Sequence, residues 1–241
     1  MKKTALILSV IIGSGVAIIS ALPLAWIGPH VVPAHMAQNA RFHGTIWQGQ
    51  ADMAFGKSRA PLTFKTSPAK LLTGREFLDF SVQNSGFNLQ GLAGFKTAKD
   101  VQIDVAIAQL PLLDPRIRGL HGDIKAQVTQ AKFGSKCKTI EGQAETDFMQ
   151  ANEATWFWQG PKLAGPLLCD EGDIVIDMRG QSVWDGNKQD ISAQLRFKAD
   201  GVYTVNMRVE TKDKRAAVVL GFYGFEPDGI QFVLSETGRW Y

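Results

Sequence analysis

The feature of this sequence that most constrains its fold is an alternation of apolar and polar residues. It recurs in at least five runs: residues 101–107, 120–128, 174–178, 191–197 and 203–209. Because successive side chains of a β-strand point to opposite faces, each run predicts a strand with one apolar face and one wet face. Parallel strands that are covered on both faces show continuous apolar runs instead. We therefore predict a mainly β fold of antiparallel strands.

Turn residues between the runs support this prediction. Residues that tolerate positive φ occur at Asn84-Ser85-Gly86, Asp185-Gly186-Asn187 and Asp200-Gly201. Helical patterns are scarce after residue 40. Pro68 to Leu72 can form one short turn, and Lys212 to Phe222 carries an apolar stripe that Gly224 would end. The β-rich part of the chain is thus expected to carry one short C-terminal helix.

A membrane anchor is indicated before the first strand. Thr4 to Ala21 is eighteen residues without a charge, and it follows Lys2 and Lys3. A helix of that length rises about 27 Å, close to the roughly 30 Å hydrocarbon core, and the preceding lysines keep the N-terminus cytoplasmic. Trp26 lies where an interfacial aromatic is expected. The expected organisation is a cytoplasmic stub and anchor over 1–27, a membrane-exit linker over 28–40 and a periplasmic domain over 41–241. The alternative is a cleaved secretory signal with a peptidase site near Ala21 or Ala37.

The chain has two cysteines, Cys137 and Cys169. A lone pair in an exported domain favours a disulfide over a metal site, since zinc needs two further ligands at short spacing. The bond would close a loop of about 33 residues, which chain-entropy arguments value at about 3–4 kcal/mol. Two buried free thiols are the alternative. The anchor and the cysteine pair together indicate a bacterial periplasmic domain.

Composition and motifs exclude several classes of function. The net charge is +3, two units of which come from Lys2 and Lys3, so there is no basic face for nucleic acid. Nucleotide-binding and zinc-hydrolase motifs are absent from the sequence, and no cofactor is expected. His121 is expected to be a solvated strand residue rather than a general base. The acidic residues Asp170, Glu171, Asp173 and Asp177 favour a solvent-facing edge strand over a metal site. No catalytic, metal or cofactor residue is predicted, and the protein is not expected to be an enzyme.

Two of the six tryptophans are candidates for an interface. Trp156 and Trp158 would lie on one side of a strand if the segment TWFWQG were extended, with Phe157 on the other side. Such a stripe can bind a lipid or a partner protein. Aromatic residues are more often found in the core, which is the alternative here.

One short segment carries a resemblance to a known family. Gly44, Thr45, Trp47 and Gly49 belong to the stretch GTIWQG, which we interpret as a short strand between glycines with one large ring to pack. After it come PLTF at 61–64, PAKLLTG at 68–74, Leu220-Gly221, Asp228-Gly229-Ile230 and SETG at 235–238. This order, behind a charge-free anchor, is similar to protein N of the type II (general) secretion pathway.

The resemblance implies an accessory subunit of an inner-membrane machine that exports folded proteins across the outer membrane. Its partners would be other type II secretion subunits, and it implies neither catalysis nor a cofactor. In this interpretation Trp47 and its flanking glycines act in packing, and strand edges contact partners. A different class remains open: a membrane-anchored periplasmic protein that binds or bridges lipid with an uncovered apolar sheet face. An envelope hydrolase is the least favoured alternative, because the chain lacks a nucleophile and base at recognisable spacing.

Overall fold

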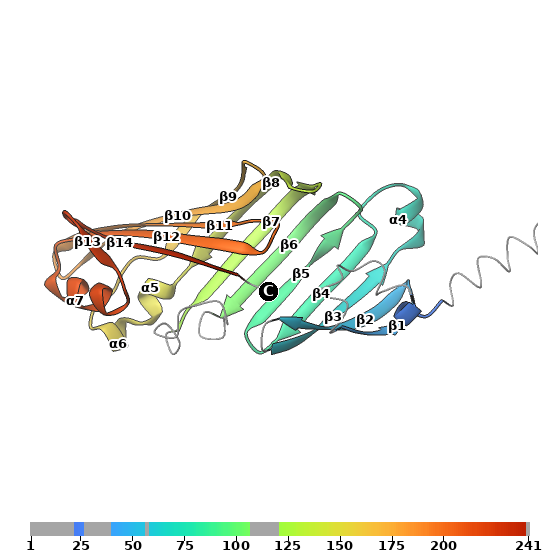
Figure 1. The fold of residues 1–241 in the computed structure, drawn as a ribbon, viewed down its shortest axis with the longest axis horizontal. Helices are drawn as coiled ribbons and strands as arrows, with labels where there is room; N and C mark the ends of the chain where they lie inside the picture. Colours follow the sequence, from blue (N-terminus) through green and yellow to red (C-terminus); the bar gives the residue numbers. More distant parts are fainter. Residues whose placement is uncertain (1–21, 27–39, 56–57, 107–120, 240–241) are drawn as a thin grey trace, which may run out of the picture.

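All strands of the computed structural model, which describes residues 22–26, 40–55, 58–106 and 121–239, form one antiparallel sheet (Figure 1). The strands of the N-terminal half are β1 (Arg41–Gly44), β2 (Gln48–Phe55), β3 (Ser58–Thr66), β4 (Leu78–Asn84), β5 (Phe87–Ala93), β6 (Thr97–Ala106) and β7 (Asp123–Phe133). Those of the C-terminal half are β8 (Cys137–Thr146), β9 (Leu163–Asp170), β10 (Asp173–Trp184), β11 (Asn187–Phe197), β12 (Val202–Thr211), β13 (Glu226–Asp228) and β14 (Gln231–Arg239). The prediction of a mainly β, antiparallel fold is confirmed.

Strand order follows the chain. Each strand from β1 to β11 pairs with the next, and at the end β14 lies between β12 and β13. The predicted turns make these hairpins possible. Asp185 and Gly186 adopt φ of 48° and 78° between β10 and β11, and Gly201 adopts φ of 81° between β11 and β12. The Asn84 side chain accepts a hydrogen bond from the amide of Gly86 (2.9 Å) in the turn between β4 and β5.

The register gives the sheet one apolar and one polar face. Paired residues on the apolar face form the row Phe42, Ala51, Leu62, Val82, Leu89, Ile103, Ala126, Ala144 and Gly165, and further along the row Met178, Ala193, Met207 and Leu234. On the other face, the row is His43, Gln50, Thr63, Ser81, Gln90, Gln102, Gln127 and Gln143. A slip of one residue would exchange the faces, so these rows specify the pairing.

Three helices pack against the apolar residues of the C-terminal strands. They are α5 (Phe148–Ala151), α6 (Glu153–Trp156) and α7 (Lys214–Phe222), and they gather at one end of the molecule, while α4 (Pro68–Leu72) lies at the other (Figure 1). Met149 and Trp158 from the segment between β8 and β9 are fully buried with Ile191 and Val209 of the sheet and Leu220 of α7. The core extends from β6 to β14, and a layer of helix covers its C-terminal strands.

The predicted anchor, Thr4 to Ala21, lies outside the described residues. Among the helices that the structure does describe, none has the length and apolar character needed to cross a membrane.

Candidate interaction surfaces

The segment GTIWQG forms the hairpin loop between β1 and β2. Gly44 pairs with Gly49, and the Thr45 amide donates to the carbonyl of Gln48 (2.9 Å). The Thr45 hydroxyl oxygen in turn accepts from the amide of Trp47 (3.3 Å). Gly44 has φ of 90°, and a Cβ there would lie 2.5 Å from the Gln48 carbonyl oxygen. The short strand expected over this segment is therefore a tight loop instead, because the two glycines allow the chain to reverse between them.

Residues 22–26 are fixed on this hairpin. Pro23 forms an isolated bridge with Thr45, and the Leu24 side chain is buried. A Cβ at Gly49 would lie 2.8 Å from both Leu24 Cδ2 and Phe64 Cζ, so only glycine leaves room for the leucine. Residues 22–26, which the expected organisation assigns to the end of the anchor over 1–27, thus contact the sheet.

Trp156 and Trp158 lie in the core. The segment that contains them is not extended: α6 ends at Trp156, and Phe157 turns the chain with φ of 52°. The two indoles stack with centroids 6.0 Å apart, and Trp156 also contacts Tyr223 at the end of α7 (5.7 Å). They are 6% and 0% exposed, whereas Phe157 is 77% exposed. The two tryptophans join α6 to α7 and the sheet, and the accessible aromatic surface here belongs to Phe157.

Two buried amides that the sequence did not single out hold this segment. Gln189 of β11 accepts a hydrogen bond from the indole nitrogen of Trp158 (2.7 Å) and donates to the carbonyl of Gln159 (3.1 Å). Asn152 accepts from the amide of His121 (2.7 Å) and donates to that residue's carbonyl. His121 is thus engaged through its backbone. Neither amide belongs to a recognisable motif, since each acts through contacts distant in sequence.

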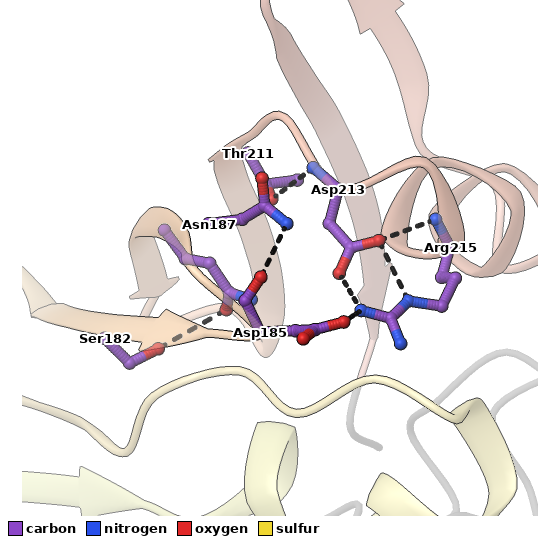
Figure 2. A network of polar contacts seen from close by, with 7 residues as sticks. Ser182, Asp185, Asn187, Thr211, Asp213 and Arg215 are labelled. Carbon is purple, nitrogen blue, oxygen red and sulfur yellow. Dashed lines mark hydrogen bonds and ion pairs between the residues drawn. The ribbon is translucent and has the colours of Figure 1, made fainter.

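The start of α7 carries the network drawn in Figure 2. Asp213 caps the helix by accepting from the amide of Arg215 (2.9 Å), and its other oxygen accepts from the Arg215 guanidinium (2.8 Å). That guanidinium also donates to Asp185 in the turn between β10 and β11 (2.8 Å). The hydrogen bonds from Arg215 hold the pKa of Asp213 below its ordinary value. The Ser182 hydroxyl lies 3.4 Å from the amide of Gln189, which links the network to the core.

The acidic cluster has an arginine at its centre. Arg196 of β11 donates to Asp170 and to Asp173 (3.1 Å), and these hydrogen bonds raise the pKa of the guanidinium above its ordinary value. The expectation of an edge strand is wrong, because β10 lies between β9 and β11. Within the described residues no group of three or more His, Cys, Asp or Glu side chains is placed to hold a metal ion.

Cys137 and Cys169 form a disulfide, as predicted. The bond joins the start of β8 to the end of β9, with Cα atoms 5.6 Å apart. The amide of Cys137 donates to the carbonyl of Gly172 in the turn that follows β9 (2.9 Å). The disulfide therefore fixes adjacent ends of two paired strands near the middle of the sheet.

The sheet offers two edges and two hollows. In the described chain, β1 and β13 are the outer strands, and β13 covers only Gln231–Val233 of β14. Cavities of about 440 Å³ and 470 Å³ lie on the polar face, the first over β5–β9 beside Gln102 and Gln127 and the second over β1–β4 beside Gln50. Sequence alternation predicted the polar face but not its hollows, which depend on the curvature of the sheet.

Comparison with known proteins gives one match. A family model described as type II secretion system (T2SS), protein N, matches residues 37–231. No curated protein and no solved structure matches the chain. The matched region includes the hairpin loop GTIWQG and all of the sheet as far as the start of β14.

Proposed function

Since this chain belongs to the protein N family of the type II secretion system, we propose that it is an accessory subunit anchored in the inner membrane by Thr4 to Ala21. Its N-terminus is cytoplasmic, and its sheet lies in the periplasm, where it contacts other subunits during export of folded proteins. Its proposed role is to scaffold the assembly rather than to catalyse a reaction.

The observation that carries this proposal is the open edge of the sheet at β14. The outermost strand, β13, is three residues long, and Pro227 in it has no amide to donate. Among the described residues, β14 beyond Val233 has a strand neighbour only on its β12 side. Short edge strands that contain proline protect a sheet from pairing with another chain. Here β13 covers β14 only as far as Val233, and the rest of β14 lacks this protection. An extended segment of another subunit can add to the sheet there by β-augmentation.

Site-specific photo-crosslinking in cells tests this surface. A photoreactive residue replaces Thr237, which is exposed on β14, and in a matched control replaces Thr129, which is exposed on the central strand β7. We expect adducts with type II secretion subunits from position 237 only. Equal yields at the two positions, or adducts lacking those subunits, would contradict the proposal.

A second candidate is lipid binding on the apolar face, and a specific observation favours it. The structure shows no second sheet opposite this face in the described residues, and the helices α5–α7 gather under the C-terminal strands (Figure 1). On this face of the N-terminal half, Leu62, Leu89 and Ile103 are half-buried, whereas Ala51 and Val82 of the same row are buried. Acyl chains can cover such a face.

Adjacent residues of β5 separate this candidate from the first. Leu89 belongs to the apolar row and Gln90 to the polar row, so a photoreactive side chain samples opposite faces at the two positions. A lipid-bridging protein should yield phospholipid adducts from position 89 and few from position 90. Absence of lipid from position 89, with subunit adducts from position 237, would reject this candidate.

A further inference from the structure

Several loops that are distant in sequence meet at one end of the N-terminal strands. The amide of Thr66 donates to the carbonyl of Trp47 (2.7 Å), so the chain enters α4 beside the hairpin loop. The amide of Phe77 donates to the carbonyl of Ala93 (3.0 Å), which places the end of the α4 segment beside the turn between β5 and β6. We call this end the α4 rim and define it as residues 22–26, 45–47, 67–77 and 94–96.

The α4 rim exposes large apolar side chains. Leu72 is 88% exposed, Phe95 80% and Trp26 71%. The ring of Phe95 contacts that of Phe77, with centroids 4.8 Å apart, which holds it outward from the turn. Leu72 lies in the last turn of α4, a helix in which no residue is buried. Three separate segments thus present apolar groups at the same end of the sheet.

The charge of the α4 rim is positive. Lys70, Arg75 and Lys96 are exposed on it, and Glu76 is its only acidic residue. Glu76 is partly buried and paired with the ammonium of Lys99 (3.4 Å). Backbone hydrogen bonding, together with the contact to Lys99, holds the pKa of Glu76 below the ordinary value. The exposed charges are therefore all basic. Exposed Trp, Phe and Leu among Lys and Arg is the composition that binds the interface of a membrane with anionic lipids.

The chain itself indicates which surface this is. Leu22 follows immediately on the predicted anchor, Thr4 to Ala21, and the segment that begins at Leu22 is bridged through Pro23 to Thr45 on the α4 rim. We propose that the α4 rim rests on the phospholipid headgroups of the membrane that contains this run, with Leu72, Phe95 and Trp26 in the interface. This inference depends on the single transmembrane span proposed above. It adds that the α4 rim is the part of the sheet that contacts the membrane surface.

The opposite end of the sheet supplies a matched control. Val183 lies near the turn between β10 and β11, outside the α4 rim, and is 69% exposed. Because Cys137 and Cys169 are bonded to each other, a single introduced cysteine is the only thiol in the oxidised protein. Phe95→Cys, Leu72→Cys and Val183→Cys can each be labelled with an environment-sensitive fluorophore in the full chain.

The test is depth-dependent quenching in vesicles. The labelled full chain is reconstituted into phosphatidylethanolamine with phosphatidylglycerol, with a spin label on a fraction of the headgroups. We expect blue-shifted emission and strong quenching at positions 95 and 72, and neither at position 183. We also expect a variant with Lys70→Gln, Arg75→Gln and Lys96→Gln to lose most of the quenching at position 95. Retained quenching in that variant would show that the charges do not contribute.

The outcomes separate the two proposals. If the protein floats with the vesicles but positions 95 and 72 are quenched no more than position 183, the transmembrane span is supported and the proposed membrane contact of the α4 rim is wrong. If the protein does not float, the span fails and the inference fails with it. The crosslinking at Thr237 reports on the accessory-subunit role independently of both results.

Discussion

Replacement of Asp213 by asparagine tests whether the ion pair at the start of α7 stabilises the fold. Asp213 is buried, and its carboxylate accepts three hydrogen bonds from Arg215, at 2.9 Å from the amide and at 3.1 Å and 2.8 Å from the guanidinium. Asparagine caps a helix about as well as aspartate, so Asp213→Asn keeps the cap and removes the charge. Asp213→Ala removes both.

The magnitude follows from these contacts. Hydrogen bonds to charged groups contribute about 1.5–3 kcal/mol, against about 1 kcal/mol for neutral ones, and the half-exposed Arg215 reduces the benefit by screening. We expect Asp213→Asn to lower the free energy of unfolding by about 1–2 kcal/mol. Loss of the cap adds about 1 kcal/mol, so Asp213→Ala should cost about 2–3 kcal/mol. Asp185→Asn, at an exposed partner of the same guanidinium, should cost less than about 0.5 kcal/mol.

The assay is urea unfolding of the full chain in mild detergent, followed by tryptophan fluorescence. Trp156 contacts Tyr223 at the end of α7 and so reports on this helix. The pKa of Asp213 is lowered in the folded protein, so its contribution is present above the unfolded pKa of about 3.9 and is lost as pH falls through the lower folded value. The difference between wild type and Asp213→Asn should therefore be largest near neutral pH and shrink below about pH 4.

Two results would refute this reasoning. One is a cost for Asp213→Asn that is the same at neutral and at acidic pH, because a charge effect must vanish when the carboxylate is protonated. The other is an equal cost for Asp185→Asn, which would show that burial of the carboxylate does not decide the strength of the pair.

Three further predictions concern stability in the same urea assay. Removal of the disulfide by Cys137→Ser with Cys169→Ser should cost about 3–4 kcal/mol, from the separation of 32 residues, and a shift below about 1 kcal/mol would contradict it. Gly49→Ala should cost about 1–3 kcal/mol by overpacking and expose residues 22–26 to proteolysis, while Gly221→Ala, with open space around it in α7, should be neutral or stabilise by up to about 1 kcal/mol. Trp158→Phe leaves a buried glutamine without its indole donor and should cost about 1–3 kcal/mol; an unchanged unfolding midpoint would show that the hydrogen bond is dispensable.

The strands were predictable because the signal for them is local. Ile103 and Ala126 alternate with polar neighbours along their own strands, and the pairing follows from consecutive hairpins. The helix at α7 was predictable for the same reason, although it begins at Lys214 rather than Lys212. The single-sheet arrangement was not predictable, since alternation shows that a face is covered but not by what.

The interaction surfaces were harder to predict, because they depend on contacts between distant residues. GTIWQG was recognised as a motif, yet its loop conformation depends on the pairing of Gly44 with Gly49 and on Leu24 filling the space beside it. The sequence pattern places Trp156 and Trp158 in an extended segment, which is wrong because the positive φ at Phe157 leaves no mark in the sequence. The α4 rim became visible only when separate turns were placed side by side.

The agreement between strand order and chain order bears on how such a protein is made. Every strand from β2 to β12 pairs with the strand that precedes it in the sequence, so a chain that emerges from its N-terminus can extend the sheet one strand at a time. The disulfide can close as soon as β9 emerges, which secures the growing sheet before its last third arrives. Among the described strands after β1, only β13 must wait for the strand that follows it. As the sheet grows, its exposed edge is therefore short-lived everywhere except at β14, the strand that arrives last.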